Sequence, residues 1–283
     1  MPLVFACFTG ALAAQENDNS PTYLALGDSV AFGLDITLLI PNQPPPPPSA
    51  FTGYPEIIAA TEHLSPGQEI NAACPGETSG SFIKSGVPDY GCNSNGPQGQ
   101  PPFKTSIGLH TNYPGTQLDF AVSVLTSDTH VKLVTLGIGS NDVLLLIKNC
   151  NSAPNPSVCV YTHLFGVLQT YAANLNHILT TIRSTAHYNR DLVLVGTYSP
   201  TADLNLVAQA LNAVTIAVGA RFHMIYADGF GAFERAAAPY GGDVCRAGLL
   251  IRLDANTCDI HPSPKGRDLL ASTVLTALSH GHH

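Results

Sequence analysis

A serine ends an apolar, strand-like run near the N-terminus. Residues 23–26 (Tyr-Leu-Ala-Leu) lead directly into the polar turn Gly27-Asp28-Ser29. A hydroxyl at the carboxyl end of a strand, with a helix behind it, lies where open α/β sheets form their clefts. The free N–H groups at the start of such a helix can also bind an anion. Asp28 or Ser29 could equally serve only to cap that helix. Ser29 is therefore a candidate nucleophile only if the chain also supplies a base and oxyanion donors.

Serine needs a base to accept its proton, and His261 is the candidate. Pro262 follows it and keeps it out of helical geometry, and residues 263–264 (Ser-Pro) signal the start of a final helix. Asp259 lies two residues earlier and could hold the imidazole in its productive tautomer. An ordinary surface histidine would show the same local pattern, so a catalytic role for His261 requires that the fold place it near Ser29.

A carbonyl group attacked by serine also needs donors for the developing oxyanion. Gly76 can present a backbone N–H with no side chain in the way, and Asn141 can present its side-chain amide. Both follow strand-like runs, as Ser29 does. Although Gly76 also fits an ordinary turn and Asn141 a helix cap, the three residues together would converge on one cleft.

The elements that must position these groups alternate along the chain, which predicts a parallel sheet with helices on its faces. After residues 23–26, strands are expected at 69–74, 131–138, 191–196 and 222–227, and helices at 54–64, 117–125, 161–186, 204–220 and 264–278. Residues 84–114 contain no apolar period. Since a loop of that length is usually functional, we expect it to border the site, as a lid if the substrate is a lipid.

Composition excludes several classes of function. The chain has 283 residues, of which 45% are hydrophobic and 11% charged, with a net charge of -8. This charge and the lack of a basic cluster argue against nucleic acid and anionic membrane surfaces as partners. Residues 204–220 are apolar but carry Asn205, Gln209 and Asn212, which favours a buried helix over a membrane span. We expect a monomer.

The N-terminus and the cysteines indicate export. Residues 1–14 are uncharged and end in the small-residue pattern Ala11-Leu12-Ala13-Ala14, which is typical of a secretion signal; Cys7 leaves a lipoprotein as the alternative. The remaining 15–283 form one expected catalytic domain. Its six cysteines fall as three local pairs, which predict the disulfides Cys74–Cys92, Cys150–Cys159 and Cys245–Cys258 in a secreted or periplasmic protein. Reduced thiols in a cytosolic enzyme are the alternative. We expect no metal site, because no Cys/His spacing resembles zinc ligands.

Four short motifs in order resemble the SGNH, or GDSL, hydrolases, most closely the secreted bacterial esterases and lipases. They are Gly27-Asp28-Ser29, residues 71–76 (Asn-Ala-Ala-Cys-Pro-Gly), Gly139-Ser140-Asn141-Asp142, and His261-Pro262 with Gly266. The resemblance implies a flavodoxin-like, three-layer α/β/α sandwich without a cofactor. It also implies Ser29 as nucleophile, His261 as base, and an oxyanion hole formed by the Ser29 N–H, the Gly76 N–H and the Asn141 side chain.

The last motif departs from the family in one respect. The family often has Asp three residues before the histidine, and here that position is Cys258. Asp259 or a backbone carbonyl is therefore left to orient His261. A carboxylate would also stabilise the imidazolium, whereas a carbonyl would only orient the ring.

These residues predict hydrolysis of carboxylic esters with short or medium acyl groups through an acyl-enzyme. Other hydrolytic readings are a lipase or lysophospholipase and a carbohydrate O-deacetylase, the last weakened by the absence of Trp. A non-catalytic cell-surface binding module belongs to a different class, and the presence of Ser29, Gly76, Asn141 and His261 together argues against it.

Overall fold

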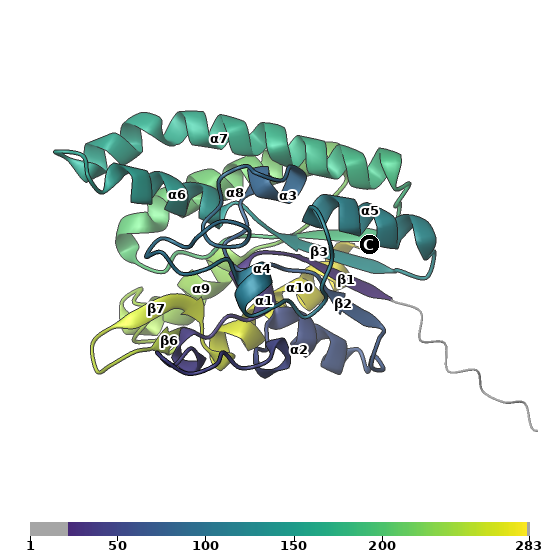
Figure 1. Ribbon diagram of the computed structural model, residues 1–283, viewed down its shortest axis with the longest axis horizontal. Coiled ribbons are helices and arrows are strands. Elements are labelled where there is room, and N and C mark those ends of the chain that lie inside the picture. The colour runs from purple at the N-terminus through teal and green to yellow at the C-terminus, as the bar shows by residue number, and fades with distance from the viewer. Residues whose placement is uncertain (1–21, 282–283) are drawn as a thin grey trace, which may run out of the picture.

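A five-stranded parallel sheet forms the centre of the computed structural model, which describes residues 22–281 (Figure 1). The expected secretion signal at 1–14 lies outside these residues. The strand order β2-β1-β3-β4-β5 is that of flavodoxin-like sheets, whose carboxyl edge holds the ligand site. The strands are β1 (Tyr23–Gly27), β2 (Glu69–Asn71), β3 (Leu133–Gly137), β4 (Asp191–Val195) and β5 (Ile225–Ala227).

The central strands form because their apolar residues are buried on both faces, as parallel sheets require. All five residues of β1 are buried, and β1 pairs along its length with β3, ending with Gly27 opposite Gly137. Gly27 has φ +142, and a Cβ atom there would lie 2.3 Å from the Gly137 carbonyl oxygen. Only glycine therefore lets the chain leave β1 in this direction.

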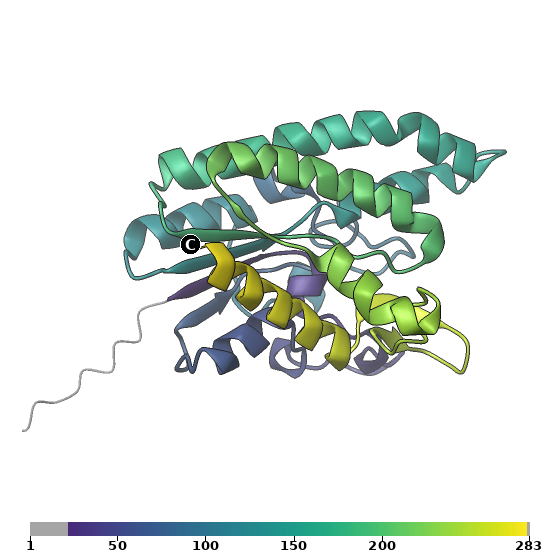
Figure 2. The same cartoon turned by 180° about the vertical axis from the view of Figure 1, so that it is seen from behind.

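Helices cover both faces of the sheet, which confirms the predicted three-layer α/β/α sandwich (Figures 1 and 2). Above the sheet in Figure 1 lie α3 (Ser79–Ile83), α5 (Gln117–Ser127), α6 (Ser140–Cys150), α7 (Pro156–Thr180) and α8 (Asn205–Gly219). Below it lie α2 (Tyr54–Thr61), α9 (Gly229–Ala237) and α10 (Pro264–Gly281), and the short α1 (Ser29–Phe32) follows β1.

The expected elements differ from the structure mainly at the carboxyl edge of the sheet. Helices α6 and α9 and an antiparallel hairpin of β6 (Leu250–Arg252) and β7 (Cys258–Pro262) were not predicted. Helix α7 begins at Pro156 rather than at 161, because Asn155 caps it by accepting from the Val158 N–H. Its first turns carry the exposed side chains Val158, Tyr161 and Phe165, so no buried face marks them as helix in the sequence.

Three disulfides join the expected cysteine pairs, Cys74–Cys92, Cys150–Cys159 and Cys245–Cys258. The second links the end of α6 to the start of α7, and the third links the β6–β7 hairpin to the segment before it. The first links the segment that follows β2 to Cys92 in the irregular segment 84–114, whose one described helix is α4 (Phe103–Ser106). The disulfides therefore secure the loops at the carboxyl edge of the sheet.

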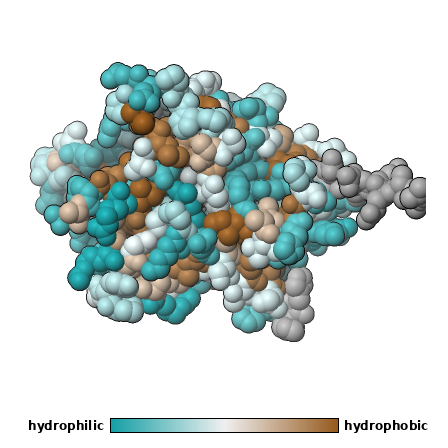
Figure 3. Space-filling model, turned by 90° about the horizontal axis from the view of Figure 1, so that it is seen from below, coloured by the Kyte–Doolittle hydropathy of each residue, from teal (hydrophilic) through white to brown (hydrophobic). Residues whose placement is uncertain are grey.

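One helical stretch among residues 22–281, Ala202–Phe222, is long and apolar enough to cross a membrane. It contains α8, whose Val207, Leu211 and Val218 side chains are buried in the core, as expected for a core helix. On the face seen from below in Figure 3, hydrophobic residues are interspersed among hydrophilic ones, in keeping with a charged fraction of only 11%.

Candidate active site

Ser29 is the first residue of α1, immediately beyond the carboxyl end of β1. Asp28 caps this helix by accepting a hydrogen bond from the Val30 N–H (3.0 Å), so Asp28 braces the turn. Burial raises the pKa of Asp28 to about 6, partly offset by the Val30 hydrogen bond and by His261. The cap fixes the start of α1 and thereby the direction of the Ser29 side chain.

His261 lies in β7 between Ser29 and Asp259. Its Nε2 is 2.9 Å from Ser29 Oγ, and its Nδ1 is 2.5 Å from Asp259 Oδ2. Burial alone would raise the pKa of Asp259, but the hydrogen bond and charge of His261 outweigh it and hold that pKa below its usual value. Because an ionised carboxylate only accepts, Nδ1 carries the proton and Nε2 is free to accept from the Ser29 hydroxyl. Asp259 thus reaches the imidazole from the two-residue spacing.

Three side chains outside the motifs hold the His261 segment. The Tyr198 hydroxyl donates to the Ile260 carbonyl (2.6 Å), and Arg267 Nε donates to the Pro262 carbonyl (3.0 Å). Arg267 also pairs with Asp35 at 3.5 Å. Sequence reasoning missed Tyr198 and Asp35 because their contacts, with Ile260 and Arg267, lie far along the chain. It missed Arg267 because no local pattern marks that residue as a support of His261.

The two other predicted donors lie on neighbouring segments. Asn141 lies in the first turn of α6, is buried, and donates from Nδ2 to the Glu77 carbonyl at 3.0 Å. Gly76, directly before Glu77, has φ +85, and a Cβ atom there would lie 2.6 Å from the Gly91 nitrogen. Only glycine fits this conformation and this close approach. The contact with Glu77 joins the Asn141 segment to the Gly76 segment.

Asp142 strengthens the same junction. Its carboxylate accepts from the Ser79 N–H (2.9 Å) and the Ser79 hydroxyl (2.6 Å), so it connects the start of α6 to the start of α3. We refer to residues 74–79 as the oxyanion loop, after the predicted role of Gly76. Two adjacent residues of α6, Asn141 and Asp142, hold this loop at two points.

A mainly aliphatic cavity opens beside Ser29. Its wall includes Ser29, Asn141 and His261, together with apolar side chains of α6 and α8: Val143, Leu144, Ile147, Val207 and Leu211. Its volume is about 80 Å³. Residues 84–114 contribute nothing to the cavity wall; instead Tyr90 and Gly91 pack behind Gly76. Residues 84–114, which were expected to border the site, therefore lie behind the oxyanion loop and not along the cavity.

One group of potential metal ligands occurs near this loop. Ligand atoms of Cys74, Glu77 and Cys92 lie within 4.8 Å of one another. The two cysteines are joined in a disulfide, so neither offers the thiolate that a soft metal ion requires. The two cysteines therefore serve as a covalent crosslink beside Glu77, and these three residues do not form a suitable metal site.

The comparisons with known proteins assign the family. The model of the GDSL-like lipase/acylhydrolase family matches residues 25–269, so the chain belongs to this family of hydrolases. No protein of curated function is matched by sequence.

Several solved structures share the fold at low sequence identity. An extracellular lipase from Streptomyces rimosus has a TM-score of 0.53 at 19% identity, covering 92% of this chain and 99% of that one. Phospholipase A1 from Streptomyces albidoflavus NA297 has 0.54 at 17%, covering 93% and 99%. An acetylxylan esterase from Geobacillus stearothermophilus, in a catalytic mutant, has 0.51 at 14%, covering 90% and 93%. At such low identities, the similarity shows a shared fold and nothing more.

Proposed function

We propose that the protein is a serine-dependent carboxylic ester hydrolase. The observation that carries the proposal is the continuous hydrogen-bonded series from Ser29 Oγ through His261 to the Asp259 carboxylate. In this series Ser29 is the nucleophile, His261 the general base, and Asp259 the group that fixes the imidazole tautomer.

The proposed reaction is a two-step acyl transfer. His261 Nε2 takes the hydroxyl proton as Ser29 Oγ bonds to the acyl carbon, and the carbonyl electrons move onto the oxygen. The N–H groups of Ser29 and Gly76 and the amide of Asn141 stabilise this oxyanion. The carbon–alkoxy bond then breaks and the alcohol leaves with the proton from His261. Water, deprotonated by His261, releases the acid and restores Ser29.

The cavity between α6 and α8 suggests the acyl group. Its apolar wall suits an aliphatic chain, and its volume of about 80 Å³ offers space for one beside Ser29. We therefore place the acyl group of the ester in this cavity, which favours esters of short or medium acyl chains.

A lipase is the second candidate, because apolar side chains are exposed beside the cavity. Ile260 lines the cavity and is exposed, and Leu206, also exposed, precedes the cavity residue Val207. Such side chains could contact a long acyl chain that leaves the cavity. We further propose that the protein is exported, since three disulfides are typical of oxidising compartments.

A panel of p-nitrophenyl esters from acetate to palmitate tests both proposals. The wild-type protein is expected to hydrolyse short esters fastest, and Ser29→Ala to lose at least about 10⁴-fold in kcat. Wild-type activity in Ser29→Ala would contradict the assignment of the nucleophile. Rates that rise steadily toward palmitate would favour the lipase.

A further inference from the structure

The oxyanion loop is held from behind by a buried glutamate that the proposed reaction does not use. Glu77 is 1% exposed and lies next to Gly76. We propose that Glu77 is a positioning residue: its carboxylate, through Gln117, holds the oxyanion loop where Gly76 and Asn141 can stabilise the oxyanion. This inference rests on the proposed function.

The main chain of Glu77 contacts the oxyanion donors directly. Its carbonyl accepts one N–H of the Asn141 amide at 3.0 Å, which leaves the second N–H of that amide for the oxyanion. A displacement of Glu77 would therefore rotate Asn141 and move the N–H of Gly76 at the same time. Since oxyanion stabilisation depends on donors held in place before reaction, the anchoring of Glu77 should affect turnover.

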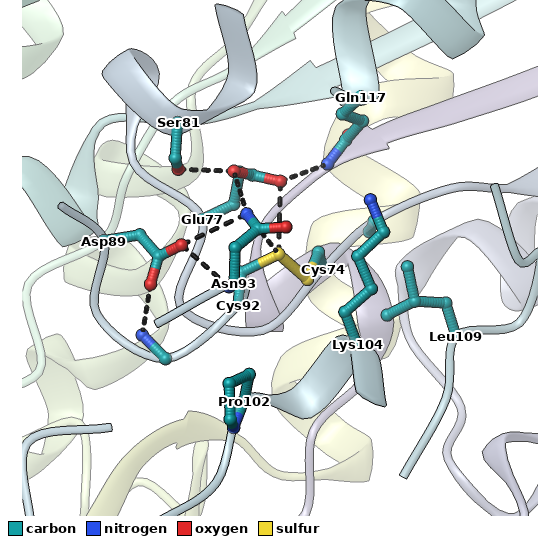
Figure 4. Close-up of a disulfide and its surroundings, with 12 residues drawn as sticks. Cys74, Glu77, Ser81, Asp89, Cys92, Asn93, Pro102, Lys104, Leu109 and Gln117 are labelled. Atoms are coloured by element: carbon teal, nitrogen blue, oxygen red, sulfur yellow. Dashed lines mark hydrogen bonds between the residues drawn. A yellow bond between two sulfur atoms is a disulfide. The ribbon is translucent and has the colours of Figure 1, made fainter. Parts of the chain in front are cut away.

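The carboxylate of Glu77 is surrounded by donors (Figure 4). One oxygen accepts from the Ser81 hydroxyl and lies 3.5 Å from Asn93 Nδ2. The other accepts from Gln117 Nε2 at 3.3 Å and lies 3.4 Å from Cys92 Sγ of the disulfide. Ser81, Asn93 and Gln117 all donate to the carboxylate, so they favour the ionised form of the carboxyl group.

Gln117 connects this carboxylate to the nucleophile strand. Its side chain accepts from the Gly27 N–H (2.6 Å) and donates to the Gly27 carbonyl (3.0 Å). Gln117 is fully buried, and Gly27 is two residues before Ser29. The series Glu77–Gln117–Gly27 thus fixes the distance between the oxyanion loop and the end of β1, independently of the Asn141 contact.

Burial, modified by neighbouring donors and charges, places the titration of Glu77 near neutral pH. Burial raises the pKa of Glu77 to about 7; Ser81 lowers it, Asp89 raises it, and Lys104 and Gln117 lower it. Glu77 in turn raises the pKa of Tyr113, after the larger effect of burial. Protonation removes one acceptor from among the donors, so the hold on the loop weakens as the pH falls through about 7.

Glu77→Gln tests the inference, because it keeps the shape and removes the charge. Glu69→Gln is the matched control: Glu69 lies in β2, its Oε1 is buried without a hydrogen-bond partner among residues 22–281, and burial raises its pKa to about 8. We expect kcat of Glu77→Gln on p-nitrophenyl acetate to fall about tenfold at pH 8.5, less than the 10²–10³ of deleting a donor outright, with KM unchanged.

The pH dependence separates positioning from a merely structural role. The ratio of wild-type to Glu77→Gln kcat should approach one near pH 5.5 and rise through pH 7, whereas the Glu69→Gln ratio should not change with pH. A pH-independent ratio for Glu77→Gln, or a change in KM alone, would overturn the inference. Should Glu77→Gln fail to fold, Ser81→Ala decides. Because the Ser81 hydroxyl lowers the pKa of Glu77, the loss of kcat on acidification should begin at a higher pH in this variant, and an unchanged acid limb would overturn the inference.

The same assays distinguish this inference from the proposed function. An inactive wild-type protein overturns both. A wild-type protein that loses activity in Ser29→Ala, but matches Glu77→Gln at every pH, overturns only the role of Glu77.

Discussion

Two Asp-x-His pairs lie at opposite edges of the central sheet. Asp128 and His130 precede β3 at its amino end, with Nδ1 2.9 Å from the carboxylate. Asp259 and His261 form the corresponding contact at 2.5 Å, beside the carboxyl end of β1. The His130 side chain is 57% exposed, whereas that of His261 is 12% exposed and its second nitrogen meets Ser29.

The difference shows that the local pair is not what makes a candidate catalytic group. Both carboxylates can orient an imidazole ring, but of the two histidines only His261 has a serine hydroxyl within hydrogen-bonding distance of its Nε2 and lines an apolar cavity. Its segment is also fixed by Tyr198, which donates to the Ile260 carbonyl. The position on the sheet, set by long-range packing, therefore separates the two pairs.

The largest expected effect compares the two histidines. His261→Ala should lower kcat on p-nitrophenyl acetate by about 10⁴- to 10⁶-fold, because Ser29 loses its base. His130→Ala, measured in parallel, should match the wild-type protein. Equal losses in both variants would remove the distinction between the pairs.

A smaller effect is expected at the two carboxylates. Asp259→Asn should lower kcat by about 10²- to 10⁴-fold, because an amide no longer fixes the Nδ1–H tautomer or stabilises the imidazolium. Asp128→Asn is the control and should keep full activity. An Asp259→Asn variant with near wild-type kcat would show that a backbone group orients His261 instead.

The smallest effect concerns stability in acid. The pKa of folded Asp259 lies below its unfolded value because His261 stabilises the carboxylate, so this stabilisation is complete above about pH 4 and is lost as the pH falls through the folded pKa. Thermal unfolding from pH 5 to 2.5 should show the wild-type protein losing up to about 1 kcal/mol more than Asp259→Asn, after allowing for solvent screening. Parallel curves for the two proteins would contradict this contribution.

The sequence predicts the sheet because its strands are continuous apolar runs. Residues 131–138 and 191–196 mark β3 and β4 within a few positions, and each motif residue follows a predicted strand or precedes a predicted helix. The order of the motifs also suffices to place Ser29, Asn141 and His261 at one edge. These features are local, so the sequence contains them.

The supports of the site are not local and could not be predicted. Tyr198 reaches Ile260 across 62 positions, and Gln117 reaches Gly27 across 90. Glu77 resembles any polar residue after a Pro-Gly turn until the fold buries it. Helix α6 was also missed, because its start is a polar turn that reads equally well as a loop.

Covalent labelling of the serine tests the proposed chemistry most directly. A fluorophosphonate reacts with a serine hydroxyl that a neighbouring base activates, and peptide mass spectrometry of the labelled protein locates the adduct. The expected result is a single adduct on Ser29, lost in Ser29→Ala and strongly slowed in His261→Ala but unaffected in His130→Ala. An unlabelled wild-type protein, or an adduct on another serine, would contradict Ser29 as the nucleophile.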